Sequence, residues 1–398
     1  MSDGALSGLR VLDMGHHIAG PFCAKLLACL GAEVIKVERP GGGDGVRRIG
    51  PFPGDIPHPE KGGLFLYLNT NKKGVTLNLK TKTGVKILQE LAKDADILLE
   101  NFEPRVMSGL GLGYDSLEKV NPRLIMTSIS NFGQTGPYRD YKAANLTEMA
   151  MGGLMYVTGQ ADRDPLRTGG SQAEYHGGLN AFVGTLTALY YRDFTGVGQH
   201  VDISIMESLV SILEYKTVMY SYQGAIAGRW YSRHPFSWPH GDIYPCKDGY
   251  VAIPPQVMWN DFGNWLGRPE LGDLKFLSLR SRLEHAGEFD GLLISGLKEL
   301  TREEVFHRGQ EVRFGTGYVA NAHDLVRDRH LMERDFFVEL DHPEAGKLTY
   351  PGLPFKLSET PGQVQRAPLL GEHNVEIYCD RLGYTREDLV RLRETGII

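Results

Sequence analysis

The stretch that decides the fold is residues 6–44, LSGLRVLDMGHHIAGPFCAKLLACLGAEVIKVERPGGGD. Its apolar run at 9–14 predicts a strand, which leads through a short loop into a helix that begins near Pro21 and stops at Gly31. A second apolar run at 33–38 predicts another buried strand. A strand, a helix and a strand in this order predict a doubly wound parallel sheet. The first loop then points at a helix N-terminus, which is a natural anion site.

The loop at 15–20 lacks the pattern G-x-G-x-x-G that cradles the pyrophosphate of a dinucleotide. Glu38 does lie where dinucleotide-binding proteins carry a ribose-binding carboxylate. Because the glycines are missing, a nicotinamide-dependent dehydrogenase stays only a distant alternative.

Strand and helix patterns continue to alternate after this first unit. Strands are predicted at 74–80, 96–102, 123–130 and 199–205, and helices at 83–94, 177–192 and 206–222. Around Gly224 the pattern changes to irregular segments that are rich in aromatic residues, glycine and proline. A short strand at 250–253 and helical patterns to about residue 330 follow, and a last helix is expected after residues 371–374.

This pattern divides the chain of 398 residues, which exceeds the size at which one hydrophobic core keeps growing. We expect a large, Rossmann-like α/β domain at 1–224 and a smaller α+β domain at 225–330. We expect the C-terminal segment at 331–398 to return to the large domain.

Composition excludes several classes of protein. With 43 basic and 49 acidic side chains the net charge is −6, so the chain lacks the excess of basic residues that is typical of nucleic-acid-binding proteins. No apolar run approaches the roughly 20 residues that span a bilayer, and no secretion signal is seen, which predicts a cytoplasmic protein. The four cysteines lack C-x-x-C spacing and are expected to be reduced and structural, with no zinc or disulfide: Cys23, Cys29, Cys246 and Cys379.

Four segments carry a resemblance to a known family. They are AGPFCAKLLACLGAEVIKVERPGGGD at 19–44, ENFEPRVMSGLGLGY at 100–114, TGVGQHVDISIMESL at 195–209 and RAPLLGEHN at 366–374. In this order they resemble the class III CoA-transferase family, also called the CaiB/BaiF or formyl-CoA transferase family, from about Leu6 to the C-terminus. The resemblance implies two chains that interlock like links, with acyl-CoA and an organic acid as substrates. It implies no permanently bound cofactor and no metal.

The reacting residue of that family is expected in PLRTGGSQAEYHGG, residues 165–178. This segment resembles the family pattern P-x-x-x-G-x-x-x-x-D-x-x-x-G, in which the aspartate is the nucleophile, and Glu174 stands in its place. A carboxylate that attacks an acyl-CoA forms a mixed anhydride and then an enzyme thioester. The extra methylene of glutamate moves the attacking oxygen by about 1 Å, and a misplacement of that order can cost roughly 100-fold in rate.

Three interpretations of Glu174 stay open. It is a relocated nucleophile, or it caps a helix, since Ser171 and Glu174 have the S-x-x-E spacing of a capping box. In the third interpretation it is a relic, and the chain is the supporting subunit of a heteromeric transferase like those acting on benzylsuccinate.

The expected CoA contacts come from matching this sequence to the family position by position. The resemblance places its contacts at His16, His17, Ile18, Ala19, Arg39, Leu77, Lys80, Asn101, Phe102 and Lys142. Arginine and lysine side chains complement the phosphates of CoA. An arginine expected eight residues after Asn101 is replaced by Gly109, and Arg105, one helical turn earlier, is the substitute that the sequence offers.

Other activities are weaker alternatives. A 2-methylacyl-CoA racemase needs a His–Asp pair where this chain has Ala144 and Asn145, and a CoA-binding scaffold would need no nucleophile. The expected function is exchange of CoA between an acyl-CoA such as succinyl-CoA and an organic carboxylate, by a homodimer or a heterodimer. A cluster of aromatic and arginine residues would suit an aromatic dicarboxylate as the substrate, or its aromatic rings could instead pack the small domain. The cluster consists of Arg229, Trp230, Tyr231, Arg233, Phe236 and Trp238.

Overall fold

The computed structural model describes residues 4–160, 162–229, 243–253, 259–276, 278, 281 and 284–398. Contacts divide the chain into two compact units. Unit 1 comprises Met1–Gly152, Gly169–Ile212 and His330–Ile398, and unit 2 comprises Gly153–Thr168 and Leu213–Arg329. This division differs from the expected boundary at 224, because residues 213–224 group with unit 2, as does the separate segment 153–168.

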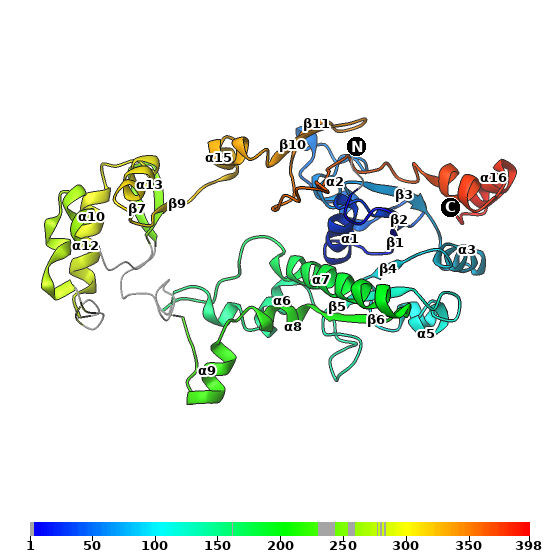
Figure 1. The fold of residues 1–398 in the computed structure, drawn as a ribbon, viewed down its shortest axis with the longest axis horizontal. Helices are drawn as coiled ribbons and strands as arrows, with labels where there is room; N and C mark the ends of the chain where they lie inside the picture. Colours follow the sequence, from blue (N-terminus) through cyan, green and yellow to red (C-terminus); the bar gives the residue numbers. More distant parts are fainter. Residues whose placement is uncertain are drawn as a thin grey trace. The chain divides into compact units, whose positions relative to one another are not determined.

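The core of unit 1 is a sheet of six parallel strands in the order β3-β2-β1-β4-β5-β6 (Figure 1). The strands are β1 (Arg10–Asp13), β2 (Glu33–Glu38), β3 (Lys72–Thr76), β4 (Ile97–Glu100), β5 (Ile125–Ser130) and β6 (His200–Ser204). The expected parallel sheet is confirmed. The strand expected at 74–80 is wrong at its end, because β3 stops at Thr76 and a turn begins at Leu79.

Helices cover both faces of this sheet. On one face α1 (Ala19–Cys29) packs along α7 (Gln172–Thr195), and both contact the strands. On the other, α3 (Lys82–Ala92) and α16 (Arg386–Glu394) share a hydrophobic core with the alternate strand residues Leu12, Ile35 and Leu98. The close approach of α1 and α7 depends on Gly178, where an added Cβ would lie 2.6 Å from the Ala19 carbonyl oxygen.

Shorter elements complete unit 1. They are α2 (Gly63–Leu68), α4 (Val106–Gly109), α5 (Tyr114–Leu117), α6 (Asn145–Met151), α8 (Ile205–Ser211), the π-helix Val375–Arg381, and the antiparallel hairpin of β10 (Phe337–His342) and β11 (Gly346–Pro351). The sequence reading did not predict this hairpin. The continuous helix expected at 206–222 is wrong, since the chain breaks at Glu214, which has a φ of 57°, and resumes as α9 (Lys216–Gln223) in unit 2.

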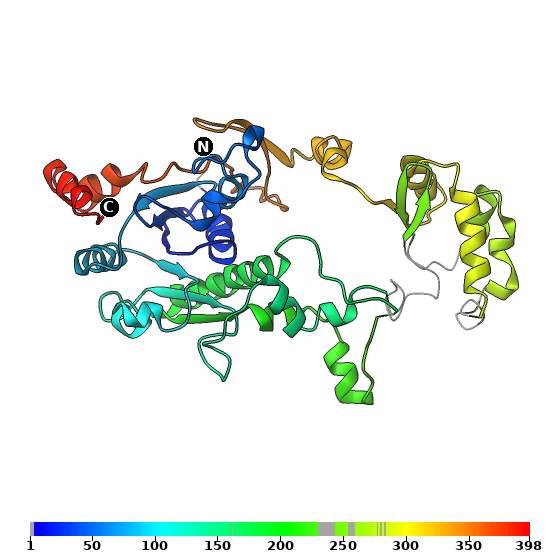
Figure 2. The same ribbon diagram turned by 180° about the vertical axis from the view of Figure 1, so that it is seen from behind.

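Unit 2 has its own core beside a small antiparallel sheet (Figure 2). Its further elements are β7 (Ile243–Cys246), β8 (Gly249–Ala252), β9 (Gly317–Tyr318), α10 (Trp259–Trp265), α12 (Ala286–Leu297), α13 (Arg302–Glu311) and α14 (Ala322–Leu325), and α15 (Arg329–Glu333) starts at its end. The core is aromatic, with Trp259 packed against Phe289 and Phe314. Across the described ranges no helix is long and apolar enough to cross a bilayer.

Candidate active site

The direction of the chain across the sheet reverses between β1 and β4. Ligands of open α/β sheets bind beyond the carboxyl ends of the strands at such a switch point. Here the loop after β1 and the loop after β4 are joined by a reciprocal pair of hydrogen bonds. The His16 N–H donates to Asn101 Oδ1 over 2.6 Å, and Asn101 Nδ2 donates to the His16 carbonyl oxygen over 2.8 Å.

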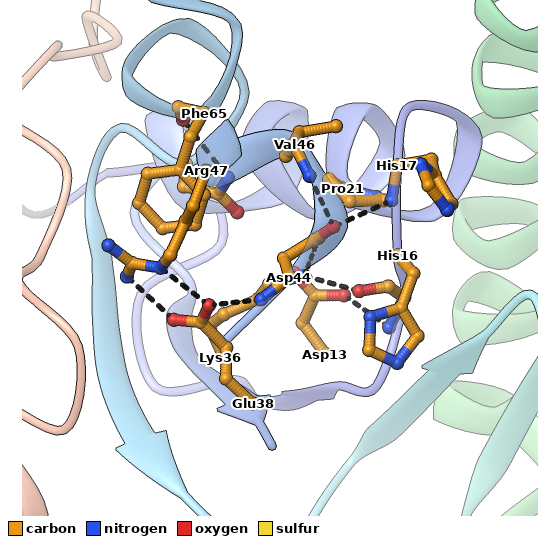
Figure 3. Close-up of polar contacts among 12 residues, drawn as sticks. Asp13, His16, His17, Pro21, Lys36, Glu38, Asp44, Val46, Arg47 and Phe65 are labelled. Carbon is orange, nitrogen blue, oxygen red and sulfur yellow. Dashed lines mark hydrogen bonds and ion pairs between the residues drawn. The ribbon is translucent and has the colours of Figure 1, made fainter. Parts of the chain in front are cut away.

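Buried charges under the loop after β1 hold its backbone (Figure 3). Lys36 on β2 donates to the Gly15 carbonyl oxygen and lies 3.1 Å from Asp44 Oδ2, and both charged side chains are fully buried. Asp44 Oδ1 accepts a hydrogen bond of 3.1 Å from the N–H of His17, whose φ is 59°. Burial disfavours the Asp44 anion, but the charge of Lys36, the nearby His16 and the hydrogen bonds from the His17 and Val46 N–H groups together outweigh burial and lower the Asp44 pKa. The position of His17 is therefore fixed by ionised groups.

A cavity of about 380 Å³ opens at this edge of the sheet. Six of the residues predicted from the sequence line it: His17, Ala19, Asn101, Phe102, Lys142 and Glu174. The loops after β1, β4 and β5 and the first turn of α7 supply its walls. The structure thus brings the predicted nucleophile and half of the predicted CoA contacts to one pocket within unit 1.

The other five predicted contacts lie outside this lining. His16 packs its ring against Phe102 at 5.1 Å, Ile18 is the buried N-cap residue of α1, and Leu77 is 3% exposed in the hydrophobic core. Arg39 and Lys80 are exposed, each shortly after the carboxyl end of a strand, β2 and β3. A ligand that reaches Arg39 and Lys80 would therefore extend from the pocket along the sheet edge.

Glu174 lies in the first turn of α7, which begins at Gln172 rather than at the expected residue 177. Ser171 occupies the N-cap position, but its side chain accepts no capping hydrogen bond from the backbone. The expected capping box is therefore wrong. Burial raises the Glu174 pKa, and a hydrogen bond from the Ser171 side chain and the nearby His17 oppose the rise. The Glu174 side chain lines the pocket.

The sequence reading missed Ser130, Asn131 and Arg139, which also line the pocket. Ser130 ends β5, so the rule that ligands bind at carboxyl ends could have found it and its neighbour. The Ser130 hydroxyl is buried and has no hydrogen-bond partner within the described residues. It is a donor available to a ligand in the pocket.

Cations at the rim are paired with local carboxylates. Lys142 bonds Glu103, and Arg105 lies 2.7 Å from Asp140. Arg105 thus pairs with Asp140, which lines the pocket, but Arg105 itself does not line it. The position of Gly109 is exposed, and no atom of the described residues lies within 4 Å of an added Cβ. Anionic groups would compete with Glu103 and Asp140 for these cations.

The aromatic cluster considered for substrate binding falls almost entirely outside the described residues, which omit 230–242. Arg229 is described, and it does not present a free guanidinium. It donates to the carbonyl oxygens of Tyr156, Gln160 and Arg163 over 3.1–3.3 Å. Arg229 therefore ties the segment 153–168 within unit 2. All four cysteines are free thiols.

Comparisons with known proteins identify similar chains over nearly the whole length of this one. A family model described as CoA-transferase family III matches residues 6–374. The chain is 36% identical to the succinyl-CoA–D-citramalate CoA-transferase of Chloroflexus aurantiacus, over 99% of this chain and 98% of that protein. It is also similar to both subunits of a succinyl-CoA–L-malate CoA-transferase of that organism. The identity to the beta subunit is 36%, over 99% of this chain and 98% of that subunit. The identity to the alpha subunit is 33%, over 99% of this chain and 92% of that subunit. A solved CaiB/BaiF family protein from Brucella suis superimposes with a TM-score of 0.86 and 28% identity, over 95% of this chain and 99% of that one.

Proposed function

The chain belongs to CoA-transferase family III, and we propose that it moves CoA from succinyl-CoA to a small dicarboxylic acid, with Glu174 as the nucleophile. The observation that carries the proposal is the position of Glu174. Its carboxylate lies in the pocket at the switch point, beside His17 and the loop of Asn101 and Phe102, with no capping role to occupy it.

The proposed reaction needs only a carboxylate and hydrogen-bond donors. Glu174 attacks the thioester carbonyl carbon, the C–S bond breaks, and CoA leaves as a thiolate while an anhydride forms. The thiolate attacks the Glu174 carbonyl carbon, which releases the first acid as a carboxylate and leaves an enzyme thioester. The acceptor acid repeats these steps in reverse. No step consumes a proton, and the unpartnered Ser130 hydroxyl is placed to stabilise an oxyanion.

The choice of substrates rests on the relatives. Relatives that match nearly the whole chain are named for transfer from succinyl-CoA to D-citramalate or L-malate. Both acceptors are small dicarboxylates that carry a hydroxyl group. We propose an acceptor of this class in preference to an aromatic dicarboxylate, because the described Arg229 donates to backbone carbonyls.

A second candidate function is that of a supporting subunit in a heteromer. Glutamate replaces the family's aspartate at 174, and the chain is similar to both subunits of one malate transferase. An exposed apolar stripe along α7 also supports pairing with a homologous chain: Leu179, Val183, Tyr190 and Phe194 are 46–74% exposed. In this candidate function the partner would carry the nucleophile.

Trapping separates the two candidates. The purified chain is incubated with succinyl-CoA and then with hydroxylamine, and Glu174 is examined by peptide mass spectrometry. We expect a hydroxamate on Glu174, because hydroxylamine captures both the anhydride and the thioester, and we expect CoA transfer to D-citramalate or L-malate. If the chain alone gives neither product but gains activity when it is co-expressed with a homologous chain, the supporting-subunit function is correct.

Affinity for CoA is expected to rise in Gly109→Arg. The site has room for the side chain, and a cation there would restore the phosphate contact that the family resemblance predicts. We expect the Kd for CoA, measured by calorimetry, to fall by about 2- to 10-fold. Gly109→Ala is the matched control, because it gives the same gain in helix propensity without the charge. Equal affinities in the two variants would contradict a CoA phosphate near this position.

A further inference from the structure

Glu148 is a buried acid next to the pocket that the sequence reading did not identify. It lies on α6, one helical turn after Asn145. Asn145 Oδ1 accepts a hydrogen bond of 3.0 Å from the Ala173 N–H, and its Nδ2 donates to the Gly170 carbonyl oxygen over 3.2 Å. Helix α6 is therefore fastened to the residues that immediately precede Glu174.

The carboxyl of Glu148 is only 1% exposed and only half satisfied. With the Asn131 amide assigned in the orientation that pairs both of its ends, its nitrogen donates to Glu148 Oε1 over 2.9 Å and its oxygen accepts from the Ala143 N–H over 3.1 Å. Glu148 Oε2 has no hydrogen-bond partner in the described part of the chain. A buried carboxylate without a cation is costly, whereas the neutral acid is not. Asn131 lines the pocket together with Glu174, so Glu148 stands directly behind the pocket wall.

The groups around Glu148 favour its neutral form. Helix α7 brings Glu174, the loop after β5 brings the uncharged Asn131, and α8 packs Leu209 against α6 at Gly152 while its Glu207 is exposed. His17 lines the same pocket and acts on Glu174. Burial, and then the charge of Glu174, raise the Glu148 pKa to about 7. Burial also raises the Glu174 pKa.

We propose that Glu148 is a positioning residue for the transfer reaction: as a neutral acid it fixes the Asn131 amide in the pocket wall and adds no second negative charge next to Glu174. This inference rests on the proposed function. When Glu148 ionises, a second negative charge lies close to the carbonyl carbon at which each oxyanion forms. Because like charge destabilises that oxyanion, transfer slows as the pH rises through the Glu148 pKa.

The test compares Glu148→Gln, Glu148→Ala and the exposed control Glu207→Gln. Glutamine keeps an acceptor for Asn131 but never ionises. We expect the wild type and Glu207→Gln to lose up to about 10-fold in kcat between pH 6 and pH 8, and Glu148→Gln to lose none. Glu148→Ala is expected to lose about 10- to 100-fold in kcat at pH 6 with little change in KM, since Asn131 is no longer held. An unchanged decline in Glu148→Gln, or full activity in Glu148→Ala, would overturn the proposal.

Infrared spectroscopy tests the neutral acid without any activity. The wild-type spectrum minus that of Glu148→Gln should contain the C=O stretching band of a protonated carboxyl at pH 6, and the band should fade near pH 7. In Glu174→Gln the band should fade at lower pH, because the charge of Glu174 is gone. Absence of the band at pH 6 would refute the proposal. A band with these properties in a protein that transfers no CoA would refute only the proposed function.

Discussion

Glu174→Gln is expected to lower kcat for CoA transfer at least about 1,000-fold, because an amide cannot form the anhydride. The Kd for CoA should change by less than about 3-fold, since all ten contacts that the sequence predicts for CoA lie before α7, the helix that carries Glu174. Steady-state assays with succinyl-CoA and calorimetry with CoA give the two numbers. The hydroxylamine adduct should disappear in the same variant.

Glu174→Asp is the matched control, because it keeps the carboxylate and withdraws it by about 1 Å. If the pocket is shaped around glutamate, we expect a loss of roughly 100-fold. Unchanged kcat in Glu174→Gln would refute the nucleophile. A gain of activity in Glu174→Asp would show that the pocket keeps the aspartate geometry, which would support the supporting-subunit function instead.

The parallel sheet was predictable because its strands are buried on both faces. Such strands read as nearly continuous apolar runs, and β1 and β2 lie within one residue of where the sequence placed them. The switch point then brought together the loops whose residues the family resemblance had marked. Six of those residues line one pocket for that reason.

Other features depend on contacts between residues far apart in sequence. The spacing of Ser171 and Glu174 is that of a capping box, yet the Glu174 side chain faces the pocket near His17, a residue on another loop. The break at Glu214 is a left-handed residue without glycine or proline to signal it. Asn131 and Glu148 meet only after α6 packs against α7 and α8. Local patterns cannot report such pairs, because competing tertiary contacts decide them.

Buried charges are equally invisible in the sequence, and the strongest example is Arg47. Its guanidinium is fully buried, and it bonds both oxygens of Glu38 at 2.7 and 2.8 Å (Figure 3). It also lies 2.5 Å from Glu60 Oε2. It also stacks over Phe65, with 3.6 Å to the ring centroid. Glu38 in turn accepts a hydrogen bond from the Asp44 N–H over 2.9 Å, so the pair supports the loop that carries His17.

Arg47→Met is expected to destabilise unit 1 by about 3–5 kcal/mol. Methionine fills the space over Phe65, but it leaves the buried Glu38 carboxylate without its positively charged partner. Hydrogen exchange of peptides from β2, followed by mass spectrometry, measures the loss of protection. The neighbouring Arg48→Met is the control, since Arg48 is exposed and, among the described residues, bonds only the Gly42 carbonyl oxygen. For this control we expect a change below about 0.5 kcal/mol.

Adding Glu38→Gln to Arg47→Met should recover part of the lost stability, because the amide still accepts from the Asp44 N–H without a charge. A double variant as unstable as the single one would show that lost packing, and not the stranded carboxylate, causes the destabilisation.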